Sequence, residues 1–117
     1  MADLNKVQLI GRLGADPERR GAGETGGVAK LRVATSYRKA GEEVSQELTD
    51  WHDVVAFGAL GDNCCKYLSK GRLIYVEGRL ASSSWKTPAG EARMRREVIA
   101  HRVDFLGAQT SAARKVA

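Results

Sequence analysis

The sequence contains few residues of the kinds that support disulfide, metal or redox chemistry. It has two cysteines among 117 residues, and they are adjacent, at Cys64 and Cys65. Adjacent cysteines fit neither a disulfide framework nor a zinc knuckle nor a C-x-x-C redox motif. We therefore expect two reduced thiols on a helix, and neither a metal nor another cofactor.

Long hydrophobic runs and targeting segments are also missing. No apolar run reaches the length of a transmembrane helix. The first residues, Met-Ala-Asp-Leu-Asn-Lys, form neither a secretory signal nor an Arg/Ser-rich transit peptide. The sequence therefore predicts a cytoplasmic protein without membrane contact.

Catalytic patterns are equally scarce. No Ser-His-Asp, Cys-His or paired-carboxylate arrangement is present. His52 and Asp53 are neighbours, but on a strand they point to opposite faces and cannot form a hydrogen-bonded pair. Residues 21–26 match G-x-G-x-x-G but lead into a strand, whereas a dinucleotide site needs this motif between a strand and a helix. We expect a flexible loop there, and no enzymatic activity.

The residues that are present favour a small globular domain with an acidic partner. Hydrophobic residues make up 43% of the chain, enough for one domain with a modest core. We expect this domain to cover residues 1–107, and the aperiodic residues 108–117 to form a short flexible tail. Nineteen Lys and Arg residues against 14 Asp and Glu give a net charge of +5. This balance favours nucleic acid as the partner, with an anionic membrane surface second.

Five strand-like segments and one helix are predicted. The strands cover residues 5–13, 28–35, 49–58, 73 to about 82 and about 93 to 106. Residues 59–70 form the helix, because Leu60, Cys64 and Leu68 lie on one stripe and Gly71 follows as a stop signal. The order β-β-β-α-β-β predicts an all-β fold, a five-stranded Greek-key OB barrel with one short helix between its third and fourth strands.

Aromatic residues are few, with two Trp, three Tyr and two Phe, and two of them share a strand. Side-chain alternation places Trp51, Asp53, Val55 and Phe57 on one face of the third predicted strand, while His52, Val54 and Ala56 face the other side. An aromatic pair of this kind can also fill the barrel interior. A carboxylate on the same face would be costly in a core, so we favour an exposed pair that binds flat ligands.

Two further rings and a set of basic residues extend this surface. Trp85 follows three serines, where little core is available, and Tyr37 comes just after the second predicted strand. Rings that stack on bases, with cations that contact phosphates, are what sequence-tolerant binding of a single strand requires. Each cation alone is equally compatible with a solvated surface charge. The binding residues that we expect are Trp51, Phe57, Trp85, Tyr37, Lys6, Arg12, Lys70, Arg72, Lys86 and Arg93.

The fourth predicted strand is apolar on both faces at its start. Ile74 and Val76 alternate with Leu73 and Tyr75. Because a small barrel has only one interior, we expect the second apolar face to contact another subunit through Leu73 and Tyr75.

A set of short motifs follows in one order between residues 5 and 107. They are Asn5-Lys6-Val7, Gly11-Arg12-Leu13-Gly14, Asp16-Pro17, Ala34-Thr35-Ser36, Trp51-His52, Val54-Val55, Phe57-Gly58, Tyr67-Leu68, Lys70-Gly71, Tyr75-Val76-Glu77-Gly78 and Trp85. In these motifs the chain closely resembles bacterial single-stranded DNA-binding proteins of the homotetrameric OB-fold type. The resemblance implies that Trp51, Phe57 and Trp85 stack on bases, and that His52 lies at the subunit interface.

The chain departs from this family pattern at several positions. Tyr37 stands where a further Trp is common, and Asp53, Ala59 and residues 82–84 stand where basic residues are common. These departures imply a weaker electrostatic grip on DNA. The sequence also lacks the acidic, Phe-terminated tip of the family. Recruitment of replication and repair enzymes through such a tip is therefore not expected.

Together these features predict a non-catalytic homotetramer that binds single-stranded DNA with little sequence preference. The resemblance implies that it protects this DNA, in association with the nucleoid, during replication, recombination and repair. Two other classes fit parts of the pattern. A protein scaffold of the primosome-accessory type has no need of exposed rings, and an oligosaccharide-binding barrel has no need of a basic balance.

Overall fold

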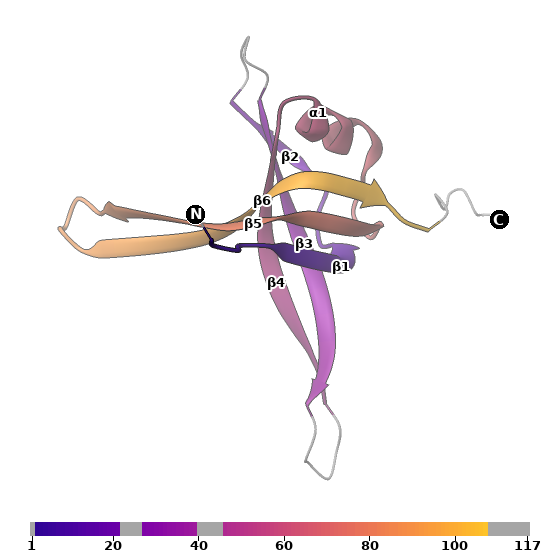
Figure 1. The fold of residues 1–117 in the computed structure, drawn as a ribbon, viewed down its shortest axis with the longest axis horizontal. Helices are drawn as coiled ribbons and strands as arrows, with labels where there is room; N and C mark the ends of the chain where they lie inside the picture. Colours follow the sequence, from indigo (N-terminus) through magenta and orange to yellow (C-terminus); the bar gives the residue numbers. More distant parts are fainter. Residues whose placement is uncertain (1, 22–26, 40–45, 108–117) are drawn as a thin grey trace.

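In a computed structural model, which describes residues 2–21, 27–39 and 46–107, the chain forms a β-barrel with one helix (Figure 1). The elements are, in chain order, β1 (Val7–Leu13), β2 (Glu18–Arg20), β3 (Val28–Lys39), β4 (Gln46–Phe57), α1 (Gly58–Tyr67), β5 (Leu73–Lys86) and β6 (Ala92–Phe105). The helix lies between β4 and β5 in the chain. These are the third and fourth strands that the sequence predicted.

Five strands close the barrel. β1 pairs antiparallel with β5, β5 with β6, and β4 with β3, while β4 and β6 run parallel. The circle closes where the end of β1 pairs with β3, at Arg12 with Ala34 and at Leu13 with Val33. This topology confirms the predicted OB barrel.

The barrel interior is filled by small and aliphatic side chains. Its most deeply buried members include Ile74, Val33, Val54 and Val76. They come from three different strands. β3 and β5 turn alternate residues inward, whereas β4 also buries Val55, on the face predicted to be exposed, between Val54 and Ala56. Among the described residues, no Phe, Tyr or Trp belongs to the buried core. Phe105 packs against this core from its rim, while Trp51, Phe57 and Trp85 lie outside it.

The helix packs its predicted stripe against the core. Cys64 is fully buried, and Leu60 packs against the buried cluster. The helix ends at Tyr67 rather than at residue 70, because the backbone of Leu68 is extended. The Leu68 N–H makes the last helical hydrogen bond, to the Cys64 carbonyl at 3.0 Å. Burial raises the pKa of the Cys64 thiol to about 11, so this thiol is protonated at neutral pH.

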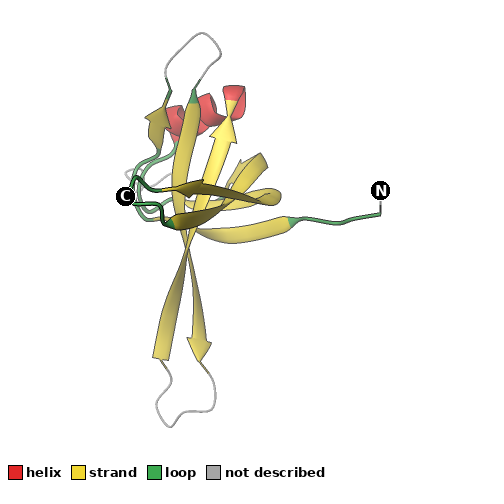
Figure 2. Ribbon diagram, turned by 90° about the vertical axis from the view of Figure 1, so that its left-hand side faces the viewer, coloured by secondary structure: helices red, strands yellow, loops and turns green. Residues whose placement is uncertain are grey.

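Two hairpins extend beyond the barrel as arms (Figures 1 and 2). β3 and β4 stay paired as far as Lys39 with Gln46, and β5 and β6 as far as Lys86 with Ala92. The sequence predicted shorter segments for β3, β4 and β5. The arm residues have no interior to face, so they lack the apolar alternation that marks a strand in a sequence. Pairing of the two backbones continues nevertheless.

A sixth strand, β2, was not among the five predicted. Its three residues are charged and exposed, and they pair with the start of β3. Arg19 of β2 donates to Asp62 of α1 at 2.6 Å. A strand of this kind depends on the open edge of its neighbour, so no periodic signal in the sequence predicts it.

Two segments singled out in the sequence lie outside the described residues. They are residues 22–26 of the G-x-G-x-x-G match and the predicted tail at 108–117. The match connects β2 to β3, which pair antiparallel, so the strand-to-helix setting of a dinucleotide site is not present. The described part of the chain has no helix with the length and apolarity needed to cross a membrane.

Candidate nucleic-acid interface

The outer face of β4, defined by Trp51, Asp53 and Phe57, carries two exposed rings. Trp51 is 50% exposed and Phe57 is 52% exposed, while Val54 and Ala56 on the opposite face are buried. Asp53 lies between the rings along the strand and is also exposed. The rings therefore do not fill the barrel. They present apolar surface to solvent, where a flat ligand can stack on them.

The Trp51 ring has two notable neighbours. The guanidinium carbon of Arg32 lies 5.0 Å from the ring centroid, within the range of a cation–π contact. On the chain after β1, Gly14 lies so close that a Cβ there would clash with Cζ3 of the ring. Together with Ala15, these residues line a surface hollow of about 280 Å³. Trp51 is thus seated in a defined place and remains half exposed.

Charges of both signs lie near the rings on the same side of the sheet. Arg32 of β3 pairs across the strands with Asp53, with 3.9 Å between Nε and Oδ1. Glu97 of β6 lies 3.8 Å from Lys30 and 3.7 Å from Arg95. The cations that accompany the rings are therefore held by carboxylates rather than grouped into one positive patch.

The β5–β6 arm carries a third ring. Trp85 is 47% exposed, and the guanidinium of Arg95 lies 6.0 Å from its centroid. Arg93 is paired with Trp85 across the arm, and it donates to Glu91 at 2.8 Å. Lys86, at the tip, is exposed. This arm therefore combines an aromatic ring with three cations, Lys86, Arg93 and Arg95.

Tyr37, the fourth expected ring, lies on the β3–β4 arm. It is 48% exposed and is paired with Leu48, whereas Trp51 is paired with Ala34. Paired residues share a face and faces alternate along a strand, so an offset of three positions puts Tyr37 on the other face of the arm. The structure does not bring Tyr37 and Trp51 together on one surface.

Three expected cations have partners elsewhere in the fold. Lys6 lies 3.5 Å from Glu77, and Arg12 donates to the carbonyl of Gly71 at 3.0 Å. Arg72 donates to the carbonyl of Leu106 at 3.0 Å. These contacts lie along β1 and β5 and at the end of β6.

Lys70 and Arg32 show the limits of the sequence signal. Lys70 is exposed in the loop before β5, where its backbone N–H donates to Asp16 at 2.8 Å. Arg32 was not among the expected binding residues, although it contacts Trp51. Alternation with Leu31 and Val33 marks Arg32 as outward-facing, but only the pairing of β3 with β4 places it beside the ring.

The residues expected at the subunit interface lie on two surfaces. His52 is half-buried, and its Nε2 lies 2.9 Å from Oγ1 of Thr35. Leu73 and Tyr75 are half-buried on the face of β5 opposite to Ile74. This confirms the predicted alternation of β5, while the subunit contacts themselves stay a prediction.

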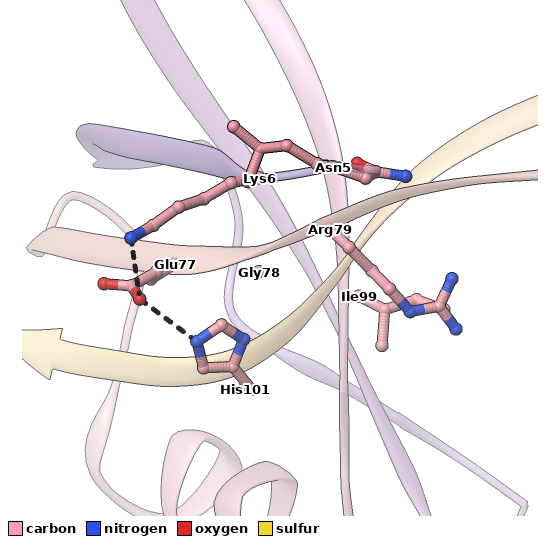
Figure 3. A pocket seen from close by; sticks show the side chains of 8 residues that line it. Asn5, Lys6, Glu77, Gly78, Arg79, Ile99 and His101 are labelled. Carbon is pink, nitrogen blue, oxygen red and sulfur yellow. Dashed lines mark hydrogen bonds and ion pairs between the residues drawn. The ribbon is translucent and has the colours of Figure 1, made fainter. Parts of the chain in front are cut away.

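Glu77 is the centre of a polar cluster next to Tyr75. Its carboxylate accepts a hydrogen bond from the Tyr75 hydroxyl at 2.6 Å and lies 3.1 Å from Nε2 of His101. The Tyr75 hydrogen bond, the His101 contact and nearby Lys6 lower the pKa of Glu77 to about 2. Figure 3 shows Lys6, Glu77 and His101 converging at the edge of a hollow of about 380 Å³.

The family model for the single-strand binding protein family matches residues 4–106. The chain belongs to this family. The matched segment includes all described strands and the helix. It also includes the rings at Trp51, Phe57 and Trp85.

Two curated relatives agree with the family assignment. The chain is 44% identical over 110 residues to single-stranded DNA-binding protein 1 of Chlorobaculum tepidum, covering 92% of this chain and 68% of the relative. It is 40% identical over 109 residues to single-stranded DNA-binding protein 1 of Xylella fastidiosa, covering 92% of this chain and 80% of that relative.

Solved structures of single-strand binding proteins have the same fold. A Plasmodium falciparum SSB in complex with single-stranded DNA has a TM-score of 0.80 at 32% identity, covering 92% of this chain and 98% of that one. The Thermus aquaticus single-stranded DNA-binding protein has a TM-score of 0.77 at 30% identity, covering 91% of this chain and 52% of that one.

No group of three or more His, Cys, Asp or Glu side chains within the described residues is placed to hold a metal ion. The distinctive surface features of this SSB-family chain are instead the half-exposed rings and the cations beside them.

Proposed function

We propose that this chain binds single-stranded DNA by stacking bases on Trp51, Phe57 and Trp85, with little sequence preference and without catalysis. The observation that carries this proposal is the exposure of all three rings in a fold whose described core contains no aromatic residue. Every base has a flat face, so stacking tolerates any sequence. Membership in the single-strand binding protein family supports the same function.

Cations next to the rings supply contacts to the phosphates. Arg95 and Arg93 accompany Trp85, and Lys86 and Lys70 are exposed at loop and arm ends. Carboxylates at Asp53 and Glu97 reduce the positive potential of this surface. We therefore expect a salt dependence shallower than that of a surface with unpaired cations. A DNA strand that also passes around the β3–β4 arm reaches Tyr37.

Lys6, Arg12 and Arg72 contribute as secondary phosphate contacts. Their present partners are a carboxylate and backbone carbonyls, and Lys6 and Arg12 are exposed. Their location on the β1–β5 side of the barrel suits a DNA strand that continues around the barrel beyond the three rings.

The functional unit is a homotetramer that covers single-stranded DNA during replication, recombination and repair. Half-buried Leu73 and Tyr75 on the outer face of β5 supply apolar area for subunit contact, and His52 contributes a further contact. We expect a cytoplasmic location in association with the nucleoid, and the two free thiols, Cys64 and Cys65, are compatible with a reducing compartment.

The decisive experiment is a fluorescence titration with oligo-dT at two salt concentrations. The wild type is expected to bind with strong quenching of tryptophan fluorescence. Its log K should fall with log salt by about 0.7 for each phosphate neutralised. Trp51→Ala should weaken binding by roughly 1–3 kcal/mol, whereas Trp51→Phe, which keeps a flat ring, should still bind.

Melting of the same samples separates binding from folding. Because Trp51 is half exposed, Trp51→Ala should leave the melting temperature close to that of the wild type. Tyr67→Leu is the matched control, since Tyr67 is an exposed ring with a cation partner, Lys66, but lies on α1. Normal affinity of Trp51→Ala together with a large loss of stability would show that Trp51 serves the fold instead.

A further inference from the structure

Arg32 has two simultaneous contacts at the Trp51 position. Its guanidinium carbon lies 5.0 Å from the ring centroid, and its Nε lies 3.9 Å from Oδ1 of Asp53. The side chains of Arg32 and Asp53 are both more than half exposed. Neither residue belongs to the core. The arrangement is therefore not required by the packing of the barrel.

The guanidinium occupies a place that a stacked base needs. A base that stacks on the ring face covered by Arg32 must displace the guanidinium. At the edge of the ring, Gly14 is in such close contact that the indole cannot move toward β1. The mobile partner in this arrangement is the arginine, because Trp51 is fixed on one side by backbone.

We propose that Arg32 is a DNA-contacting residue that lies on Trp51 in the free protein and moves to a phosphate when a base stacks there. Asp53 holds the guanidinium beside the ring in the absence of DNA, so its carboxylate takes the place of that phosphate. This inference rests on the proposed binding of single-stranded DNA through Trp51.

The balance of interactions permits this exchange. A cation–π contact and an ion pair are both weak at exposed sites. A guanidinium forms stronger, bidentate hydrogen bonds with phosphate, and binding to DNA also releases condensed counterions. Arginine suits both states, because its planar group stacks on a ring and also matches the geometry of phosphate oxygens.

The test compares Arg32→Gln with the wild type and with Arg19→Gln in oligo-dT titrations over a range of salt concentrations. Arg19 is a matched control, because it is also an exposed arginine paired with an aspartate, Asp62, on the β2 side of the barrel. Arg32→Gln should lose affinity several-fold at low salt and lower the slope of log K against log salt by about 0.7, as expected for one lost phosphate contact. Arg32→Lys should keep the slope, and Arg19→Gln should match the wild type.

A second measurement follows the guanidinium directly. In nuclear magnetic resonance spectra of the free protein, the ring current of Trp51 should shift the Nε–H signal of Arg32, and saturating oligo-dT should move that signal. Asp53→Asn should bind oligo-dT more tightly than the wild type, because the competing carboxylate is removed. All variants should melt near the wild-type temperature, since the exchanged side chains are exposed.

The outcomes separate the two proposals. If the wild type does not bind oligo-dT, the proposed function fails and this inference fails with it. If the wild type binds but Arg32→Gln keeps the wild-type slope, or the Arg32 signal stays unchanged on saturation, the inference alone is overturned. A loss of affinity in Asp53→Asn would overturn the role given to its carboxylate.

Discussion

Gly14 shows how a single missing side chain makes room for the ring of Trp51, a proposed binding residue. A Cβ at this position would clash with Cζ3 of Trp51 and lie 2.7 Å from Cη2. Its backbone is not in the left-handed region, so alanine is compatible with the local conformation. The absence of a side chain serves the ring rather than a turn.

Replacing Gly14 by alanine is therefore expected to move the indole without unfolding the protein. Gly14→Ala should weaken oligo-dT binding and change the quenching of tryptophan fluorescence, with a melting temperature near that of the wild type. In a Trp51→Phe background the same change should have little effect, because phenylalanine lacks the outer atoms of the indole. An equal loss of affinity in both backgrounds would contradict this explanation.

Glu77 makes a pH-dependent contribution to stability. Its native pKa of about 2 lies below the value of about 4.3 expected in the unfolded chain, chiefly because the Tyr75 hydroxyl donates to its carboxylate. A lowered native pKa means that the stabilisation is fully present above the unfolded value and is lost as the pH falls through 4 toward 2.

The glutamine variant tests this contribution. Melting temperatures measured between pH 6 and pH 2 should fall less steeply for Glu77→Gln than for the wild type. Glu91→Gln removes the same charge from an exposed position on the β5–β6 arm and should follow the wild-type curve. Parallel curves for Glu77→Gln and the wild type would refute the prediction.

At the level of elements, the β5–β6 arm holds proposed binding residues but none of the residues of the buried core. None of the buried core residues lies between Ala81 and Glu97, although this segment contains Trp85 and the cations around it. The barrel part of β5 and β6 supplies the core instead, through residues such as Val76 and Val98. The arm is an extension of backbone pairing that carries the proposed binding residues away from the barrel.

Shortening the arm is expected to weaken DNA binding while the barrel stays folded. A variant in which Ala81 and Glu97 are joined by an Asn-Gly turn should keep the circular dichroism and melting temperature of a folded barrel. Its affinity for oligo-dT should fall by about tenfold or more, from the loss of one stacking ring and its cations. Met94→Ser, which alters an exposed residue on the other face of the arm, should bind normally. Unchanged affinity after shortening would remove the arm from the DNA path.

For the whole molecule, assembly is the expected use of the apolar surface on β1 and β5. Ile10 is 58% exposed and pairs across the strands with Tyr75. An exposed aliphatic side chain beside a half-buried aromatic one on a small barrel favours contact with another copy. A monomeric barrel would leave this surface in water.

Light scattering should therefore find a species near four times the chain mass of 12.7 kDa. His52→Tyr should loosen the assembly, because a bulkier ring would replace a half-buried imidazole that contacts Thr35. A monomer of the wild type at micromolar concentration would contradict the prediction. A His52→Tyr protein that keeps the wild-type mass at all dilutions would exclude His52 from the interface.

Much of this architecture was predictable because local periodicity reports which face of an element is buried. The alternation around Val54 predicted a barrel strand, and the stripe of Leu60, Cys64 and Leu68 predicted the helix between the third and fourth strands. Asp53 argued for exposed rings, since a carboxylate on their face would be costly in a core. The exposures of Trp51 and Phe57 agree with that argument.

The sequence by itself determined the order of the strands, the helix between them and the exposed position of Trp51, since these depend on neighbours along the chain. Only the tertiary structure decided that β2 pairs with β3, and that Arg32 faces Asp53 beside Trp51. It also placed Tyr37 on the face of the β3–β4 arm opposite to Trp51. The physical reason is strand register. Which residues meet across a sheet depends on pairing between distant segments, and no local pattern of polarity specifies it.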